Sequence, residues 1–132
     1  MMGWLLNRGK LLADRKKLGL WGEKRCEGFL KKKGFKRLVR NFYCKSGEID
    51  LIMADTEGAV VFVEVKTRAD ESFGPAESVI TTAKKTRMSR AARYFLATHN
   101  ISDRPYRFDV VTIVLGQKGQ PQIRHYENAF VP

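Results

Sequence analysis

The sequence predicts an α/β domain in which helices pack on a mixed β-sheet. Apolar residues recur at helical spacing in two segments, and runs rich in valine and aromatic residues predict five strands. A strand, a crossover helix and a second strand between residues 60 and 115 require at least one parallel strand pair. The chain has 132 residues, the length of one ordinary domain, so we expect a single sheet with helices packed on it.

The expected elements follow in the order helix, three-strand meander, helix, strand, strand. Helical spacing covers residues 18–33, with Gly34 as the stop, and residues 81–98, with Thr81 or Thr82 as the N-cap. Residues 70–75 are expected to be loop. The predicted strands cover residues 35–44, 48–54, 60–67, 107–115 and 122–126.

The composition is that of a folded protein. Hydrophobic residues make up 43% of the chain and aromatic residues 11%, which is enough for a core and argues against disorder. No apolar run approaches the ~20 residues that span a bilayer, and the opening MMGWLLNRGK lacks the apolar block and cleavage site of a secretory signal. Cys26 and Cys44 form neither a disulfide framework nor a CxxC motif, so we expect small apolar fillers. These features predict a reduced, cytoplasmic protein.

The positive charge is concentrated in the first third of the chain. The formal net charge is +11; residues 1–46 hold 14 Lys and Arg against three acids, and residues 47–132 hold 11 of each sign. A localised basic excess attracts polyphosphate through counterion release, so it favours nucleic acid as the partner over a merely soluble basic surface. Residues 1–17 would be a basic arm or helix ahead of a single domain over residues 18–132, and contact with anionic lipid is the weaker alternative.

Charged residues interrupt the apolar runs of the hairpin GEIDLIMADTEGAVVFVEVKTR, residues 47–68. Side chains on a strand alternate faces, which on the first strand places Ile49, Leu51 and Met53 opposite Glu48, Asp50 and Ile52. On the second strand one face would carry Val60, Phe62, Glu64 and Lys66. A half-buried hairpin with a wet side is the simplest interpretation, but the apolar residues among the charges indicate cover on both faces. A charge in such a run is costly unless it is paired or bound to metal.

The hairpin holds the parts that metal-assisted phosphoryl chemistry needs. Asp50 and Glu64 are 14 residues apart with one turn between them, so adjacent strands can bring their carboxylates together. Two converging carboxylates repel each other, and a hard divalent cation with oxygen ligands, Mg²⁺ or Mn²⁺, would relieve that repulsion. Lys66 projects from the same face as Glu64, where an ammonium could steady the charge developing on a phosphate or orient a metal-bound water.

Asp50 followed on the next strand by Glu64, Val65 and Lys66 resembles the PD-(D/E)XK superfamily of restriction endonuclease-like proteins, whose core has the order αβββαβ. More narrowly, the chain resembles the YraN-like family of small bacterial predicted endonucleases, over residues 18–130. Small single-domain members of the superfamily are similar to archaeal Holliday-junction resolvases. Ile49 stands where the name of the motif has proline, a change that leaves the chemistry untouched. The narrower pattern is matched by Leu18-Gly19 with Gly22-Glu23, Arg40-Asn41, Gly47 to Asp50, Phe62 to Lys66 with Arg68, Lys84, Arg107-Phe108-Asp109 and Asn128-Ala129-Phe130.

The resemblance implies a set of site residues. Asp50 and Glu64 would bind metal, Lys66 would be the catalytic lysine, and Glu23 on the first helix would complete the acidic cluster. Glu23 shares a helical side with Cys26, so it is expected to lean inward. Without the resemblance it would be an ordinary first-turn acid that favours the helix dipole.

Five residues are candidates for contact with phosphate: Arg40, Asn41, Arg68, Lys84 and Arg87. Lys84 interrupts the apolar stripe of the second helix, so it points toward the sheet or the cleft, either to meet a phosphate or to snorkel along the core. Arg40 and Asn41 could grip a backbone phosphate or cap a turn. Arg87 could contact phosphate or belong to a solvated face.

Other polar residues have simpler explanations. Glu48 shares the face of Asp50 and is either an acid that supports the site or a solvated residue of the strand edge. Asp109 would pair with its neighbour Arg107. His99 and His125 have no partner at ligand spacing, so we expect both at the surface.

The sequence therefore predicts a metal-dependent endonuclease, with DNA favoured over RNA as the substrate. The basic first third would clamp the backbone, and the short chain leaves little length for a sequence-reading module, so we expect recognition of branched or damaged DNA. A homodimer would suit a two-fold junction. The rival prediction is a non-catalytic nucleic-acid-binding adaptor with a nuclease-like fold, against which the acids argue because carboxylates repel phosphate unless metal intervenes.

Overall fold

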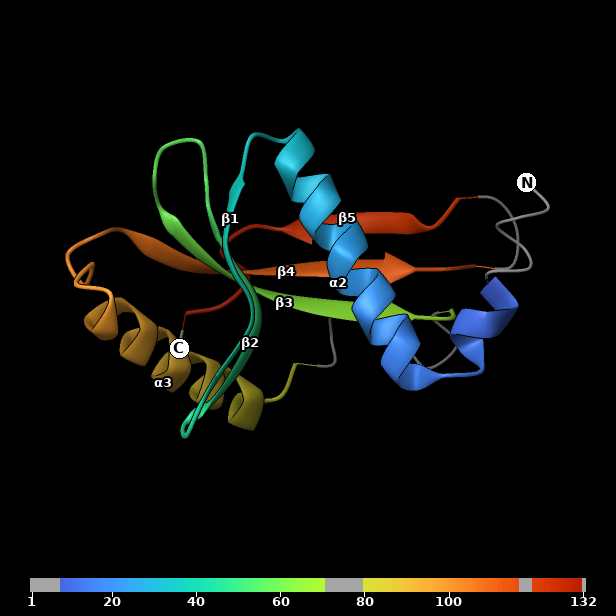
Figure 1. Ribbon diagram of the computed structural model, residues 1–132, viewed down its shortest axis with the longest axis horizontal. Helices are drawn as coiled ribbons and strands as arrows, with labels where there is room; N and C mark the ends of the chain where they lie inside the picture. The colour runs from blue at the N-terminus through green and yellow to red at the C-terminus, as the bar shows by residue number, and fades with distance from the viewer. Residues whose placement is uncertain (1–7, 71–79, 117–119, 132) are drawn as a thin grey trace.

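The strands of the described chain form one five-stranded sheet with a helix on each face (Figure 1). The structure is a computed structural model that describes residues 8–70, 80–116 and 120–131. The two long helices are α2 (Arg15–Lys32) and α3 (Thr82–Thr98), and residues 8–12 form a further short helical segment ahead of α2. In spatial order, the strands are β1 (Lys36–Cys44), β2 (Gly47–Ala54), β3 (Val60–Arg68), β4 (Tyr106–Val114) and β5 (Gln122–Tyr126).

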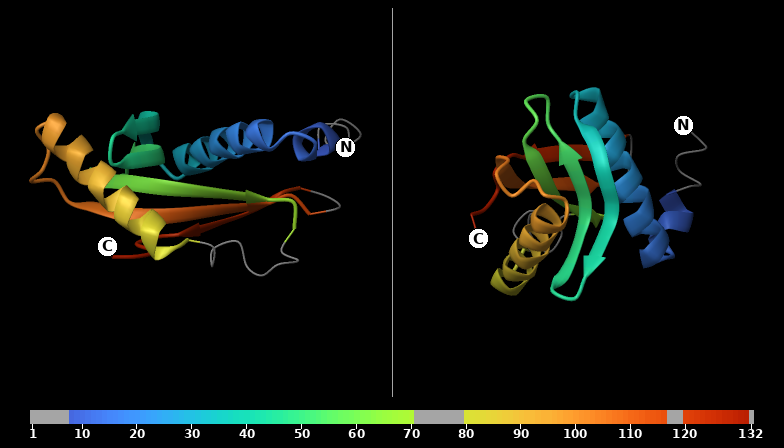
Figure 2. Two further views of the ribbon diagram at one scale, coloured as in Figure 1. Left: turned by 90° about the horizontal axis from the view of Figure 1, so that it is seen from below. Right: turned by 60° about the vertical axis from the view of Figure 1, so that its left-hand side comes forward.

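The sheet is mixed, as the sequence predicted. β3 and β4 pair in parallel, whereas β1 with β2, β2 with β3, and β4 with β5 pair in antiparallel fashion. α3 supplies the crossover between the two parallel strands. Figure 2 shows α2 and α3 on opposite sides of the sheet. The α/β class is confirmed, and the order of elements is compatible with a restriction endonuclease-like core.

The first helix begins earlier than expected. The carboxylate of Asp14 caps α2 by accepting the backbone N–H groups of Lys16 at 3.0 Å and Lys17 at 3.2 Å, so the helix starts at Arg15 rather than Leu18. Residues 15–17 of the expected basic arm thus belong to α2, while residues 1–7 and most of the expected loop at 70–75 lie outside the described residues.

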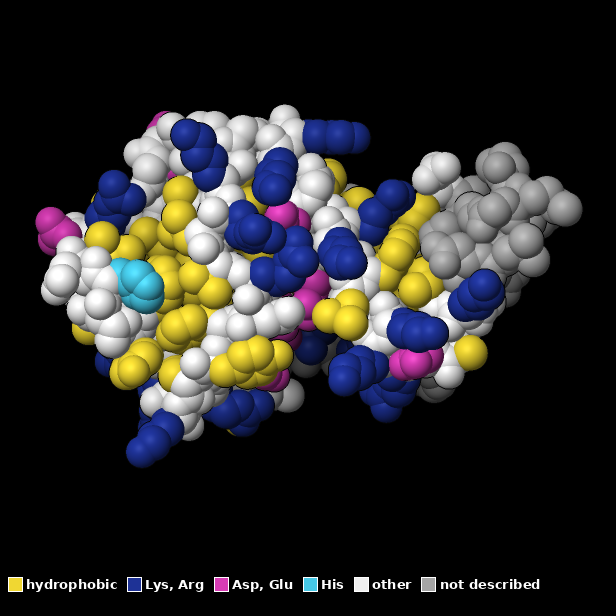
Figure 3. Space-filling view, in the orientation of Figure 1, with side chains coloured by type: hydrophobic (Ala, Val, Ile, Leu, Met, Phe, Trp, Pro, Cys, Tyr) yellow, Lys and Arg dark blue, Asp and Glu magenta, His cyan; other side chains and the backbone are white. Residues whose placement is uncertain are grey.

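Basic side chains gather over α2 and β1 on one face of the molecule (Figure 3). Acidic side chains appear between them, so part of this positive surface is locally compensated. In the described ranges, no helix combines the length and apolarity that crossing a membrane would require.

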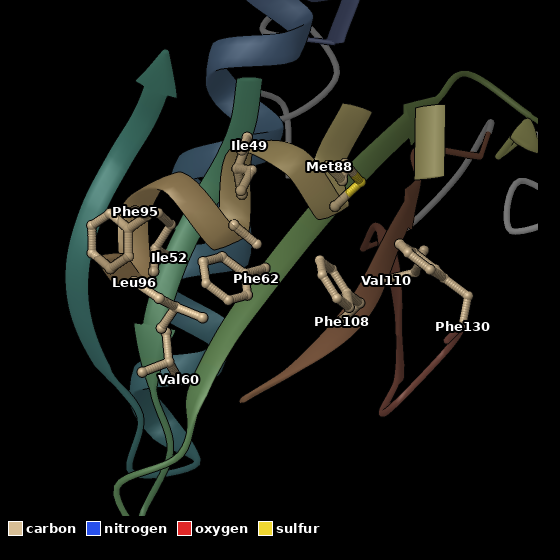
Figure 4. Close-up of a cluster of buried hydrophobic side chains, with 12 residues drawn as sticks. Ile49, Ile52, Val60, Phe62, Met88, Phe95, Leu96, Phe108, Val110 and Phe130 are labelled. Carbon is tan, nitrogen blue, oxygen red and sulfur yellow. The ribbon is translucent and has the colours of Figure 1, made fainter. Parts of the chain in front are cut away.

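The larger core lies between the sheet and α3. Figure 4 shows aromatic rings at its centre, with Phe62 5.5 Å from Phe108 and 6.1 Å from Phe95 between ring centroids. The predicted helical stripe is confirmed, because Met88 and Ala91 are fully buried and Phe95 is nearly so. A second cluster on the opposite face packs α2 against the sheet and includes the fully buried free thiol of Cys26, one of the two expected fillers.

The alternation expected along β2 is wrong at Ile49. Ile49 packs with Ile52 in the cluster on the α3 face (Figure 4), whereas Leu51 and Met53 pack on the α2 face. Residues 49 and 52 are an odd number of positions apart and would lie on opposite faces of a regular strand, so the strand must twist out of its regular alternation between them.

A local break in strand pairing explains this change in alternation. Pairing of β2 with β3 ends at Leu51 and Val63, and beyond it the carboxylate of Asp50 accepts the N–H of Val65 at 2.9 Å. On the other side, Asn41 lies between the residues of β1 that pair with Leu51 and Ile49, and its φ is +55°. An asparagine in this left-handed conformation redirects the strand.

The expectation that His125 lies at the surface is also wrong. Its side chain is only 1% exposed, with Nε2 2.7 Å from Asp109 Oδ2 and Nδ1 2.9 Å from Lys33 Nζ. These partners come from other elements, so local spacing could not reveal them. Asp109 does pair with Arg107, whose Nε lies 3.0 Å from Oδ1, and His99 is exposed, as expected.

Candidate active site

The carboxylates of Asp50 and Glu64 meet where β2 and β3 separate. Glu64 is almost fully buried, and its side chain forms a hydrogen bond with that of Asp50. The Val65 N–H that Asp50 accepts holds its carboxylate toward β3. The break in strand pairing therefore creates the space in which the two acids approach each other.

Two lysines neutralise Glu64 from different elements. Lys66, two residues along β3, places Nζ 3.1 Å from Glu64 Oε2. Lys84, in the first turns of α3, places Nζ 3.6 Å from Oε1, within ion-pair distance but too far for a good hydrogen bond. Lys84 thus points toward the sheet at Glu64, one of the two orientations expected for it.

Asp50 is held in an environment that favours its neutral form. Burial raises the pKa of Asp50 to about 8, and the charge of Glu64 and the hydrogen bond with it act in the same direction. The Val65 N–H opposes this shift without cancelling it. A carboxyl with this pKa at the side of a second carboxylate is typical of a functional site.

Glu23 leans inward from α2 toward the same place, as expected from its helical spacing. Its Oε1 is buried without a hydrogen-bond partner, and its side chain also forms a hydrogen bond with Asn41. Burial raises the pKa of Glu23; Asn41 and the charge of Arg40 lower it, and the charges of Glu48 and Glu64 raise it again. The charges of Glu64 and Glu23 also raise the pKa of Asp50, so the acids of this cluster act on one another electrostatically.

A cleft of about 360 Å³ exposes this cluster to solvent. Its walls come from the first half of α2 and the end of β3, and Arg15 and Arg68 supply positive charge on the two sides. Glu23, Asp50, Glu64 and Lys66 all line it. Every residue that the sequence assigned to catalysis is therefore found at one cleft.

The two converging acids fit a hard divalent cation. Mg²⁺ is commonly held by one or two carboxylates and keeps several waters, and Asp50 with Glu64 supplies such a pair. Glu64 Oε1, like Glu23 Oε1, is buried without a hydrogen-bond partner. Within the described ranges, however, no three His, Cys, Asp or Glu side chains converge as a ligand set. The role of Glu23 as a third ligand stays a prediction.

The five candidates for phosphate contact lie in different surroundings. Arg68 lines the cleft and Arg87 is exposed beside the β1–β2 turn, whereas Lys84 is engaged with Glu64. Arg40 donates from Nε at 3.1 Å and from Nη2 at 2.9 Å to Glu27, and Asn41 is bonded to Glu23. Arg40 and Asn41 therefore support the walls of the site, and direct contact with phosphate stays a prediction for all five. Glu48 is exposed.

The reasoning from sequence missed Glu27. Glu27 is 5% exposed, and its carboxylate forms ion pairs with three cations: Lys31 at 2.8 Å, Arg37 at 3.3 Å and Arg40 at 2.9 Å. Burial alone would raise the pKa of Glu27, but hydrogen bonds from Lys31 and Arg40 and the positive charges of Arg40 and Arg37 lower it to about 2. The spacing of Glu27 four residues before Lys31 was the only available signal, and it revealed one partner of the three.

Comparison with known sequences decides the family. The family model described as "Uncharacterised protein family UPF0102" matches residues 22–113. A UPF0102 protein of Pelobacter propionicus is 42% identical over 118 residues, covering 89% of this chain and 84% of the relative. The chain belongs to UPF0102. UPF0102 proteins of Geotalea uraniireducens and Caldicellulosiruptor saccharolyticus are 42% and 41% identical over 118 residues, which is 89% of this chain and 92% and 99% of theirs. Membership of UPF0102 confirms the narrower of the resemblances drawn from the sequence.

Proposed function

We propose that this UPF0102 protein is a metal-dependent endonuclease of the PD-(D/E)XK type that hydrolyses phosphodiester bonds in DNA. The observation that carries the proposal is the meeting of Asp50 and Glu64, from neighbouring strands, in an open cleft that Lys66 also lines. A site that only bound phosphate would gain nothing from buried carboxylates, because they repel the ligand. Such acids become useful when a cation lies between them and the phosphate.

Each side chain has a role in this proposal. Asp50 and Glu64 would hold Mg²⁺ or Mn²⁺, which when bound polarises a phosphoryl oxygen and lowers the pKa of water. The Val65 N–H orients Asp50, and Lys84 fixes one oxygen of Glu64. Lys66, 3.1 Å from the other oxygen, presents an ammonium to the cleft, where it would stabilise negative charge on the phosphate and support the attacking water.

The substrate is proposed from charge and from the shape of the cleft. Arg15 and Arg68 on its two walls would bind phosphates beside the scissile one. In the described ranges the chain forms one sheet with its helices and no separate module for reading bases, so branched or damaged DNA is the proposed substrate. Cytoplasmic location and homodimer formation remain predictions from the sequence.

A non-catalytic nucleic-acid adaptor is the second candidate. It is favoured by one observation, that no three-residue ligand set converges among the described residues. Against it stands Glu23 Oε1, which is buried without a hydrogen-bond partner, beside Glu64 Oε1, which has only the distant ammonium of Lys84; a bound cation would give both oxygens a partner.

A cleavage assay separates the two. Linear, flapped and four-way DNA are incubated with Mg²⁺, with Mn²⁺ and with EDTA, using wild type, Asp50→Asn and Lys66→Ala. Glu57→Gln is the matched control because Glu57 is an exposed acid in the β2–β3 turn. We expect cutting only with metal and a loss of roughly 100-fold or more in the two site variants, with DNA binding retained. Equal cutting by all proteins would indicate a contaminant, and binding without cutting under every condition would favour the adaptor.

A further inference from the structure

A second groove lies between the β1–β2 turn and α3, two segments that lie side by side in Figures 1 and 2. Its volume is about 600 Å³, and it is lined by Tyr43, Cys44, Lys45, Ser46 and Tyr94. Both tyrosines are unusually exposed for aromatic residues: Tyr43 is 67% exposed and Tyr94 is 53% exposed. An exposed ring beside a groove offers a stacking surface to a planar ligand.

Tyr94 is supported from within the protein. The centroid of its ring lies 6.3 Å from that of Phe42, which itself packs edge-on against Phe95 at 5.3 Å. This contact with a core residue restricts the ring while leaving half of the residue exposed to solvent. A ring held in this way loses little conformational entropy when a ligand stacks on it.

The charge around Tyr94 is positive. The sequence of α3, TAKKTRMSRAARYFLAT, contains five basic residues and no acid. Arg87, Arg90 and Tyr94 follow the spacing i, i+3, i+7, so they share one face of the helix, and Lys45 lines the groove from the β1–β2 turn. The three cations are exposed, and none of them pairs with an acid of the described part of the chain. Glu48 lies opposite Tyr43 in the β1–β2 register, so charge complementarity to phosphate is strongest around Tyr94.

We infer that this groove binds unpaired nucleotides, with a base stacked on Tyr94 and the adjoining phosphates held by Arg87, Arg90 and Lys45. Aromatic rings interleaved with cations are the usual means of holding single strands, because every unpaired base has a free face. Bases inside a duplex are stacked on each other and cannot use such a ring. The inference rests on the nucleic-acid substrate of the proposed function, not on hydrolysis, and it names the feature recognised: unpaired bases beside a duplex.

The groove and the catalytic cleft are joined through α3. Lys84, whose Nζ lies 3.6 Å from Glu64, precedes Tyr94 by ten residues, or about 15 Å of helix. This distance corresponds to about four base steps of stacked DNA. The β1–β2 turn is seated on the same helix, because a Cβ at Gly47 would lie 3.0 Å from Arg87 Cβ. An unpaired base in the groove would thus lie a few nucleotides from a phosphate in the cleft.

Binding to a fluorescein-labelled oligothymidylate and to a blunt duplex, both in EDTA, tests the inference without relying on cleavage. Fluorescence anisotropy is measured for wild type, Tyr94→Ala and Tyr94→Phe. Tyr106→Ala is the matched control, because Tyr106 is a 43% exposed tyrosine that pairs with Val60, at the end of β3 away from Lys66. Circular dichroism melting of each variant verifies that it is folded.

We expect Tyr94→Ala to weaken oligothymidylate binding about tenfold and duplex binding less than twofold, with Tyr94→Phe and Tyr106→Ala close to wild type. Unchanged oligothymidylate binding in folded Tyr94→Ala, or an equal loss for both ligands, would overturn the inference. So would a change from dimer to monomer in Tyr94→Ala on size-exclusion chromatography, because the groove would then be a subunit interface. If the Tyr94 effect appears while no DNA is ever cut, the endonuclease proposal fails and this inference stands.

Discussion

Asp50 links the stability of the fold to what the cleft contains. In the absence of a cation its carboxyl lies beside Glu64 and is partly withdrawn from water, so the neutral acid is the favoured form. The hydrogen bond between the two acids then requires a proton, which is lost as the pH rises. The same two groups that would bind a cation are thus a source of repulsion when none is present.

The first prediction is that the metal-free protein loses stability between about pH 4 and pH 8 because of Asp50. Its pKa rises from 3.8 to about 8 on folding, so its stabilising contribution is complete below pH 3.8 and is lost as the pH rises through 8. Asp50→Asn lacks this proton and keeps the hydrogen bonds to Val65 and Glu64. We therefore compare the free energy of unfolding of Asp50→Asn with that of wild type, measured by urea denaturation in EDTA. We expect this difference to shift in favour of the variant by roughly 2 to 4 kcal/mol between pH 4 and pH 8.

Glu57→Gln serves as the control, because Glu57 is exposed in a turn and should leave the pH profile of wild type unaltered. If Asp50→Asn and wild type followed parallel profiles from pH 4 to pH 8, burial would not raise the pKa of Asp50.

At the scale of elements, Glu27 ties α2 to β1. Its carboxylate lies on α2, and Arg37 and Arg40 reach it from β1. This connection also supports the cleft, because Arg40 is followed by Asn41, whose side chain is hydrogen-bonded to Glu23 in the cleft wall. A buried carboxylate with several cationic donors is strongly held, and removing its charge leaves those donors without their partner.

The second prediction is that Glu27→Gln lowers the free energy of unfolding by about 3 kcal/mol at pH 7. The pKa of Glu27 falls to about 2 on folding, so its contribution is present above pH 4.5 and is lost as the pH falls toward 2. The difference between variant and wild type should therefore shrink in acid, as measured by urea denaturation at pH 7, 5 and 3. Glu127→Gln, at an exposed acid, is the control. A difference that stayed constant with pH would show that the charge of Glu27 is not the cause.

The third prediction concerns the approach of α2 to β3. A Cβ at Gly22 would overlap Thr67 Oγ1 and lie 3.1 Å from Thr67 Cβ, so only glycine allows this helix to sit so close to the strand. Gly22→Ala should destabilise the fold by about 1 to 3 kcal/mol and displace Glu23 from the cleft. Gly28→Ala, in the same helix with open space around it, should be neutral or stabilising by up to about 1 kcal/mol. Thermal melting checks both, and Thr67→Ala should partly restore Gly22→Ala. Equal melting temperatures for the two alanine variants would contradict the close packing.

At the scale of the whole molecule, the class and order of the elements could be predicted from the sequence because they depend on local periodicity. The helical stripe through Met88 and Phe95 and the crossover between β3 and β4 are examples. The pair of Asp50 and Glu64 was equally accessible, since a single turn joins their strands. Features that depend on residues distant in sequence were not.

Two corrections and one omission share this cause. The face of Ile49 depends on the break in pairing around Asp50, and the burial of His125 depends on Asp109 and Lys33. Glu27, which the sequence did not reveal, holds Arg40 from another element. No periodicity within one segment carries information on where its pairing with a neighbouring strand ends or on the partner of a charge. Electrostatic contacts between elements are thus the part of the site that required the structure.

The fourth prediction tests whether the position of positive charge, rather than its total, governs binding to DNA. Neutralising one phosphate contact should reduce the slope of log affinity against log salt by about one. Arg15 lines the cleft, whereas Arg104 is exposed in the turn before β4, at the opposite end of the parallel strands from Lys66. Arg15→Gln and Arg104→Gln change the net charge of +11 by the same amount. We expect only Arg15→Gln to reduce the slope, measured by fluorescence anisotropy on flapped DNA in EDTA over a series of salt concentrations. Equal slopes for the two variants would mean that DNA senses only the overall charge and that the cleft is not where the backbone is held.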